Sequence, residues 1–233
     1  MFGLNPIMKQ DLLQPKLWVH SIFRTIQGEG PMAGIPAIFV RLAGCNLKCY
    51  WCDTDFDTGT WMTAAEVQAK ADELSTGYNI PLLVLTGGGP LRQNILPLIK
   101  LSTNREIQIE TAGTLWIKDL ESYVQSGRVT IVCSPKTGKV HESINEWCHN
   151  WKYIVKEAWA TTASGLPDVS TQRKEVSQGI CRPPPGARVF VQPVDEQDAE
   201  RNLQNGLFAA KIAMKNGYTL TLQLHKILGL ELS

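Results

Sequence analysis

Short runs of branched apolar residues recur along the chain and alternate with segments of helical periodicity. The runs predict strands at 17–23, 37–42, 82–85, 106–109, 129–133, 153–155, 189–191 and 219–223. Helices are predicted at 63–74, 94–101, 115–125, 142–148 and 196–215. The first begins with a capping box from Thr63 to Glu66, and the last ends at Asn216-Gly217. Strands that alternate with helices indicate an α/β fold with a mainly parallel sheet.

Polar or glycine-rich motifs follow most of the predicted strands. They are Gly44-Cys45, Thr86-Gly87-Gly88-Gly89-Pro90, Glu110-Thr111-Ala112-Gly113, Ser134-Pro135-Lys136, Gln192-Pro193 and His225-Lys226. Ligand sites of parallel α/β folds gather at the carboxyl ends of the strands. We therefore expect these motifs to line one shared opening.

No linker or repeat divides the chain, and its length suits one domain or two small ones. We expect a single domain over residues 1–233. Residues 158–185 are rich in Thr, Ser, Pro and Gly, and this composition predicts a long surface excursion rather than a domain linker.

Composition and charge exclude several classes of partner. The 233 residues are 43% hydrophobic with a formal net charge of +1, so no overall field favours nucleic acid or an anionic membrane. No apolar run is long enough to span a bilayer, and residues 1–16 lack a secretory apolar region. We expect a cytoplasmic protein with reduced thiols that binds neither nucleic acid nor a membrane.

The most specific chemical signal is the spacing of Cys45, Cys49 and Cys52. Three thiolates can ligate three irons of a [4Fe–4S] cluster, whereas a closed cluster takes four. The fourth iron would then be open to a chelating ligand. A zinc site or a closed cluster remains an alternative, but Cys133, Cys148 and Cys181 form no second metal-binding pair.

The ordered set of motifs resembles a known family. The cysteine spacing, with Trp51 before the last cysteine, is similar to that of the radical S-adenosylmethionine (SAM) superfamily. More narrowly, the chain resembles the 7-carboxy-7-deazaguanine synthases. The matching stretches are Gln27–Gly30, Gly34–Leu42, Gly44-Cys45, Cys49–Thr54, Thr86–Gly88, Ile109–Thr111, Ser134–Lys136, Gln192-Pro193 and His225-Lys226.

The resemblance implies a partial (βα) barrel in which SAM chelates the open iron of a [4Fe–4S] cluster. It implies cleavage of SAM to a 5′-deoxyadenosyl radical, which takes hydrogen from 6-carboxy-5,6,7,8-tetrahydropterin. Ring contraction and loss of ammonia then give 7-carboxy-7-deazaguanine, on the route to queuosine and preQ0. A one-electron donor such as flavodoxin, a Mg²⁺ ion and a homodimer are further implications.

The resemblance also assigns residues. Cys45, Cys49 and Cys52 would hold the cluster, and Thr54 would hold Mg²⁺. SAM contacts would be Trp51, Cys52, Asp53, Gly88, Ser134, Pro135, Lys136, Gln192, Pro193, Val194 and Asp195. Substrate contacts would be Ile26, Gln27, Gly28, Glu29, Arg41, Thr86 and His225.

One position departs from the superfamily pattern, which has Glu where this chain has Gly89. Loss of that carboxylate would weaken SAM binding by about 1.5–3 kcal/mol unless another group replaced it. Two other classes share the cysteine motif: a radical SAM activase or maturase of a peptide, and a non-catalytic iron–sulfur protein. SAM cleavage with formation of a deazaguanine product would distinguish the synthase from both.

Overall fold

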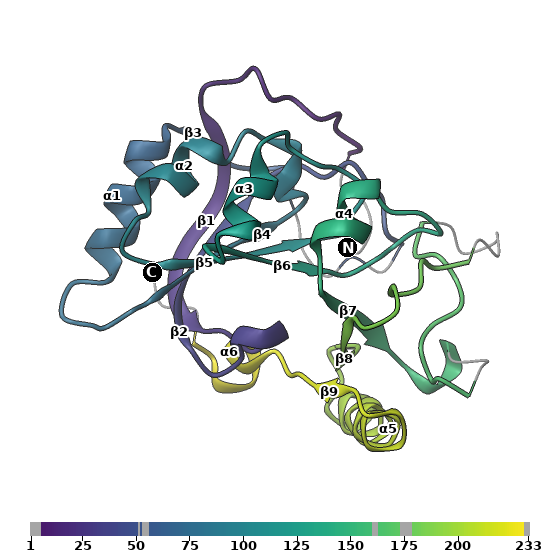
Figure 1. Ribbon diagram of the computed structural model, residues 1–233. Helices are drawn as coiled ribbons and strands as arrows, with labels where there is room; N and C mark the ends of the chain where they lie inside the picture. The colour runs from purple at the N-terminus through teal and green to yellow at the C-terminus, as the bar shows by residue number, and fades with distance from the viewer. Residues whose placement is uncertain (1–5, 51, 53–55, 160–162, 173–178, 231–233) are drawn as a thin grey trace.

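A computed structural model describes residues 6–50, 52, 56–159, 163–172 and 179–230 of the chain. Within this part, one sheet runs through the molecule in the order β3-β1-β2-β4-β5-β6-β7-β8-β9 (Figure 1). The strands are β1 Leu17–Ile26, β2 Pro36–Leu42, β3 Thr60–Met62, β4 Leu82–Gly87, β5 Glu106–Thr111, β6 Val129–Cys133, β7 Asn150–Val155, β8 Arg188–Pro193 and β9 Thr219–Leu220. From β2 to β9 all neighbours in the sheet are parallel, whereas β1 pairs antiparallel with β2 and β3. The expected α/β fold with a mainly parallel sheet is confirmed.

The helices that connect the parallel strands pack on one face of the sheet. They are α1 Ala64–Leu74, α2 Leu96–Leu101, α3 Leu120–Gln125, α4 Glu142–Trp147 and α5 Ala199–Asn216. Val67 of α1, Ile99 of α2 and Ile212 of α5 share a buried apolar cluster with Ile38 and Val40 of β2. None of the helices in the described part of the chain is long and apolar enough to cross a membrane.

The period of two along each strand gives the other face of the sheet a different character. In β2, Ile38, Val40 and Leu42 point into the helix-covered core, whereas Ala37 and Phe39 belong to a smaller cluster on the opposite face. Polar side chains occupy further positions on that face in β4, β5, β7 and β8. The curved sheet therefore presents a concave, partly charged surface, as in the partial barrel that the motifs predict.

Short elements account for the differences from the predicted pattern. The predicted strand at 219–223 is reduced to β9, because the chain turns after Leu220 into helix α6, Leu224–Leu228. The placement of His225 at a strand end was therefore wrong, since His225 lies in α6. Strand β3 was not predicted, and the 3-10 helices at Gly30–Met32, Pro90–Arg92 and Glu157–Trp159 are further short turns.

Three predicted helices begin later than the sequence pattern suggested, and α5 begins at Ala199 rather than at residue 196. Helix α2 begins at Leu96, which leaves its proline in the first turn, where no backbone N–H is needed. Helix α3 begins at Leu120, after Asp119 in the left-handed conformation with φ 73°. The capping box of α1 forms as predicted, with reciprocal bonds between Thr63 and Glu66.

The segment predicted as a surface excursion contributes buried residues where it is described. Leu166 and Ile180 join the main apolar cluster, and Ser170 and Thr171 are also buried. The Thr171 carbonyl accepts a hydrogen bond from Tyr50 N at 3.1 Å. This part of the segment therefore lies against the cysteine motif.

Candidate functional site

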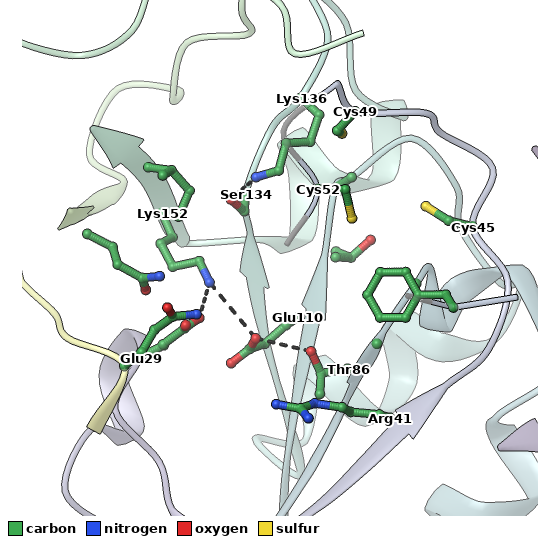
Figure 2. A pocket seen from close by; sticks show the side chains of 18 of the residues that line it. Glu29, Arg41, Cys45, Cys49, Cys52, Thr86, Glu110, Ser134, Lys136 and Lys152 are labelled. Atoms are coloured by element: carbon green, nitrogen blue, oxygen red, sulfur yellow. Dashed lines mark hydrogen bonds and ion pairs between the residues drawn. The ribbon is translucent and has the colours of Figure 1, made fainter. Parts of the chain in front are cut away.

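A cavity opens at the carboxyl ends of the parallel strands, on the concave face of the sheet (Figure 2). The motifs that follow β2, β4, β5, β6 and β8 all contribute to its wall, as the sequence pattern predicted. Its lining residues from the sequence-based assignments are Glu29, Arg41, Cys45, Cys49, Cys52, Thr86, Gly88, Ser134, Lys136, Gln192, Pro193, Val194, Asp195 and His225.

The cysteine segment begins where the chain leaves β2 and is fixed by backbone contacts. Gly44 has φ +76°, and its N–H donates to the Phe56 carbonyl at 2.7 Å. The Gly44 carbonyl accepts from Gly89 N at 3.0 Å. A Cβ at Gly88 would lie 2.2 Å from that same carbonyl, so only glycine lets the two loops approach this closely.

The side chains of the three cysteines line the same opening (Figure 2), and one of their sulfurs has hydrogen-bond donors beside it. Cys49 Sγ accepts from Thr171 Oγ1 at 3.0 Å and from Gln172 Nε2 at 3.2 Å. Among the described residues, no three His, Cys, Asp or Glu side chains surround a single metal ion. A cube has a different requirement, because each cysteine ligates a different iron. The segment therefore fits a [4Fe–4S] cluster better than a mononuclear zinc site.

Burial raises the pKa of the Cys45 thiol to about 11. A cysteine must lose its proton to bind iron, so cluster assembly at this position would release a proton. Donors such as those at Cys49 stabilise the thiolate form of a ligand.

The wall between the cysteines and β8 carries ionic and polar groups. Lys136 Nζ donates to Ser134 Oγ at 2.5 Å, and burial lowers the pKa of Lys136. Asp195 accepts from Gln197 N and Asn202 Nδ2, both at 2.9 Å, and pairs with Lys226 at 3.1 Å. Burial alone would raise the pKa of Asp195, but these bonds hold it below its usual range.

The opposite end of the cavity holds three charged side chains from separate parts of the fold. Glu29 comes from the turn after β1, Glu110 from β5 and Lys152 from β7. Lys152 Nζ donates to Glu29 Oε2 and lies 3.9 Å from Glu110 Oε2. All three side chains are at most 15% exposed. We call Glu29, Lys152 and Glu110 the buried triad.

Neutral donors surround the second carboxyl of the triad. Glu110 Oε1 accepts from Gln27 Nε2 at 2.9 Å and Gln108 Nε2 at 3.2 Å, and Oε2 lies 3.2 Å from Thr86 Oγ1. Burial raises the pKa of Glu110, and the neighbouring charge of Glu29 raises it further. Burial acts the same way on Glu29, but the charge and hydrogen bond of Lys152 outweigh it and lower its pKa.

Two further polar side chains complete this end of the cavity. The Arg41 guanidinium lies 4.6 Å from the centre of the Phe23 ring, and Arg41 is in register with Thr86 of β4. His225 is 4% exposed, with its ring 5.7 Å from that of Phe39. The planar guanidinium of Arg41 therefore lies beside the buried triad (Figure 2).

Several residues assigned by resemblance do not line the cavity. They are Ile26, Gln27, Gly28 and Pro135, while Trp51, Asp53 and Thr54 lie outside the described residues. Gln27 is fully buried behind the triad, where its Oε1 accepts from Gly28 N and Glu29 N at 2.8 and 3.1 Å. A Cβ at Gly28 would lie 2.0 Å from the Leu222 carbonyl, so this glycine permits a close backbone approach.

The departure at Gly89 leaves room for a side chain. Gly89 has an ordinary extended backbone, with φ −142° and ψ 92°. A Cβ there would meet Asn46 Oδ1 at 3.4 Å and Cys45 Sγ at 3.8 Å. Neither strain nor crowding therefore requires glycine at this position.

Glu110 and Lys152 were absent from the sequence-based assignments. Glu110 was visible only as part of a motif after a strand. Lys152 had a weaker signal, a single cation within the otherwise apolar run from Trp151 to Val155. The other lining residues not assigned from the sequence are Phe39, Leu47, Lys48, Phe56, Gly87, Thr111, Ala112, Ile154, Gln223 and Lys226.

Comparisons with known proteins agree with this arrangement. The Radical SAM superfamily matches residues 40–171, more than half of the chain, which includes the cysteine motif. A 7-carboxy-7-deazaguanine synthase of Rhodospirillum rubrum is 39% identical over 98% of this chain and 99% of the relative. The enzyme of that name from Rickettsia prowazekii is 38% identical over 99% of this chain and 96% of the relative. The chain belongs to the 7-carboxy-7-deazaguanine synthase family of the radical SAM superfamily.

A solved structure shows the same fold. The crystal structure of QueE from Escherichia coli matches with a TM-score of 0.62 at 21% identity, over 90% of this chain and 95% of that one. At this identity, the likeness concerns the fold alone.

Proposed function

We propose that the protein is a radical SAM 7-carboxy-7-deazaguanine synthase, which converts 6-carboxy-5,6,7,8-tetrahydropterin to 7-carboxy-7-deazaguanine with loss of ammonia. The observation that carries the proposal is one cavity with three cysteines at one end and a buried triad of charges at the other. Membership of the family supplies the reaction. The product belongs to queuosine and preQ0 biosynthesis.

The cysteine end would hold the cofactors. Cys45, Cys49 and Cys52 would ligate the [4Fe–4S] cluster, and SAM would lie against the following wall residues: Cys52, Gly88, Ser134, Lys136 and Gln192–Asp195. When bound, this pair supplies one-electron cleavage of SAM and a carbon radical that removes hydrogen from the substrate. The surrounding chain holds the reactants together and excludes water and competing hydrogen donors.

The other end would bind the pterin. Arg41 would hold the substrate carboxylate, since a guanidinium can donate two parallel hydrogen bonds to it. Glu29, Thr86 and His225 would face the ring, whose polar edge alternates donors and acceptors. Gln27 and Gly28 would act from behind, by holding Glu29 and the turn in place.

Mg²⁺ is a further part of the proposal. The resemblance assigns it to Thr54, with an oxygen ligand of the kind that this ion prefers. Omission of Mg²⁺ with EDTA should lower the turnover of the reconstituted protein, and added Mg²⁺ should restore it.

The decisive experiment is anaerobic incubation of the cluster-loaded protein with SAM, dithionite and the carboxytetrahydropterin. We expect 5′-deoxyadenosine and 7-carboxy-7-deazaguanine by chromatography and mass spectrometry. Deoxyadenosine without the deazaguanine would refute the synthase, and absence of SAM cleavage would favour a binding protein. The proposed physiological reductant is a one-electron donor protein such as flavodoxin. The proposed location is the cytoplasm, where thiols stay reduced.

A homodimer is also proposed, and helix α5 offers a surface for it. Leu203, Leu207 and Met214 are exposed along one side of α5, with the small Ala210 between them. The first turn of the helix contains Glu200, and the last contains Lys215. If α5 of a second copy packed antiparallel against it, the two apolar sides would be in contact. The acidic first turn of each helix would then lie beside the basic last turn of the other.

The substitution Leu207→Glu tests this surface. We expect it to shift a dimer toward monomer in light scattering, whereas Leu101→Glu, at an exposed leucine of α2, should not. A wild-type monomer, or a dimer unchanged by Leu207→Glu, would contradict the α5 contact.

A further inference from the structure

The buried triad places two carboxyl groups around one ammonium group, and each of the three side chains is at most 15% exposed. Its members come from β5, β7 and the turn after β1, far apart in the sequence, and Lys152 lies between the two acids (Figure 2). A buried charge is stable only when it is paired. One ammonium group can neutralise one carboxylate, so the second carboxyl group would be a buried charge without a partner if it were also ionised. The position of Lys152 relative to Glu29 and Glu110 therefore influences which of the two acids is ionised.

The contacts of the two acids are unequal. Lys152 Nζ forms a direct hydrogen bond with Glu29 but lies 3.9 Å from Glu110, beyond hydrogen-bond reach. Glu29 thus has the charged partner, while the hydrogen bonds to Glu110 come from amides and a hydroxyl.

The two oxygens of Glu110 also differ. Oε1 accepts from two amide groups, those of Gln27 and Gln108, as a carbonyl oxygen would. Among the described residues, the Thr86 hydroxyl is the only group that lies within hydrogen-bond distance of Oε2, and a hydroxyl can accept as readily as donate. A proton on Oε2 is therefore compatible with every contact of this carboxyl.

The other titratable groups near the triad lie on different elements. Lys136 follows β6, His225 lies in α6 and Arg41 in β2, and all three line the cavity. The charge of His225 favours the ionised form of Glu29, whereas Lys152 is the cation that favours ionisation of Glu110. Burial and the charge of Glu29 both favour the neutral form of Glu110.

We propose that Lys152 is a positioning residue that makes the two carboxyls unequal, so that Glu29 meets the substrate as a charged acceptor and Glu110 as a neutral donor. This rests on the proposed function for the ligand. The ring edge of the pterin carries N–H donors beside acceptor atoms, and a pair of unlike carboxyls can satisfy both. Two like carboxylates could serve only the donors.

A matched pair of substitutions tests the difference. Glu29→Gln and Glu110→Gln make the same chemical change on two sides of Lys152. We measure binding of the carboxytetrahydropterin to cluster-loaded protein with SAM and no reductant, by calorimetry. Glu29→Gln should weaken binding by about 30-fold or more, because it removes a charged acceptor.

Glu110→Gln should keep the affinity within about threefold, since an amide reproduces a neutral acid with one acceptor and one donor side. Equal losses for the two variants, or a larger loss for Glu110→Gln, would overturn the proposal.

The pH dependence supplies a second readout. Because the pKa of Glu110 is raised, the neutral form predominates below that pKa and is lost as the pH rises through it. Wild-type affinity should therefore fall with rising pH, and Glu110→Gln should remove that fall. A pH profile unchanged by Glu110→Gln would contradict a donor role.

An infrared measurement decides the matter without substrate. The protein should show a protonated-carboxyl band near neutral pH that is lost in Glu110→Gln. In Glu29→Gln the band should disappear at a lower pH than in the wild type, because the charge of Glu29 favours the neutral form of Glu110. Absence of the band from the wild type would overturn the proposal even if the protein turns over. Presence of the band without pterin binding would instead mean that the proposed function fails while the unequal carboxyls stand.

The role of Lys152 itself is tested by removing its charge. In Lys152→Met, substitution of Glu29 or of Glu110 by Gln should have similar effects on binding, to within about threefold. Because Lys152→Met leaves a buried carboxylate without its partner and so destabilises the fold, Glu29→Gln/Lys152→Met provides a second variant without the ion pair. It should recover thermal stability and still bind the pterin weakly; recovery of full affinity would show that the pair serves folding alone.

Discussion

The cysteine segment brings three sulfurs to the cavity from one short stretch of chain, whereas the buried triad takes its members from β5, β7 and the turn after β1. At the cysteine end, the spacing of Cys45, Cys49 and Cys52 in the sequence is enough to indicate that these side chains act together. At the triad, only strand pairing and the inward direction of alternate residues bring the charges together. One end of the site is therefore encoded locally and the other by the fold.

This difference predicts how each end fails. A change in the cysteine segment should remove the cofactor and leave the fold, because the segment lies at the rim of the cavity. Loss of the charge of Lys152 or Glu29 should affect stability and substrate binding together, because this ion pair is buried.

The largest effect is expected from Cys49→Ala. Two thiolates would remain for a cluster that needs three protein ligands. Iron and acid-labile sulfide should fall to background, with SAM cleavage lost and the melting temperature of the cluster-free protein little changed. Cys181→Ala, at a thiol that does not line the cavity, is the control and should keep its cluster. Full iron content in Cys49→Ala would separate this residue from the cluster.

A large stability effect is expected from Lys152→Met. Removal of one member of a buried ion pair costs about 3–5 kcal/mol of unfolding free energy, because the remaining carboxylate has no charged partner. Lys156→Met removes the more exposed pair with Glu196 just beyond the same strand and should cost about 1 kcal/mol or less. Urea unfolding of both variants measures the difference; equal losses would mean that burial does not distinguish the two pairs.

A moderate effect is expected from Arg41→Lys. The ammonium cannot form a two-pronged contact with a carboxylate or stack on Phe23 as the guanidinium does. The substrate KM should rise about tenfold with little change in kcat. Arg24→Lys, which changes an arginine over the Tyr78 ring, is the matched control and should leave the KM unaltered. An unchanged KM in Arg41→Lys would place the substrate carboxylate elsewhere.

The smallest effect is expected from Thr171→Val. This removes the hydroxyl that donates to Cys49 Sγ, and hydrogen bonds to cluster sulfurs influence the reduction potential. The cluster should assemble but become harder to reduce, by on the order of 40 mV for one weak hydrogen bond. Redox titration followed by electron paramagnetic resonance measures this. Ser170→Ala, whose hydroxyl donates to the Lys136 carbonyl, should not shift the potential.

Most of the sheet could be predicted from the sequence because its strands are rich in branched apolar residues, which form continuous buried runs in β2 and β4. The capping box of α1 was equally visible, since its two partners are three residues apart. Gathering of the strand-end motifs around one opening followed from the parallel arrangement alone.

The parts that could not be predicted depend on contacts remote in sequence. Strand β3 has three residues and α6 has five, too few for either period to be recognised. Lys152 lies within a mainly apolar strand, and nothing in the neighbouring sequence indicates which acid pairs with its ammonium group. Only the structure shows that Glu29 and Glu110 are its neighbours.

The contact between Gly28 and Leu222 has a consequence for synthesis of the protein. The Gly28 carbonyl accepts from Leu222 N at 3.3 Å, so the turn that holds Glu29 is fixed by a segment that is translated much later than the turn itself. Domains emerge from the ribosome amino end first, and contacts this remote form late. The nascent chain can present its cysteines to iron-delivery factors long before the turn that carries Glu29 is held in place.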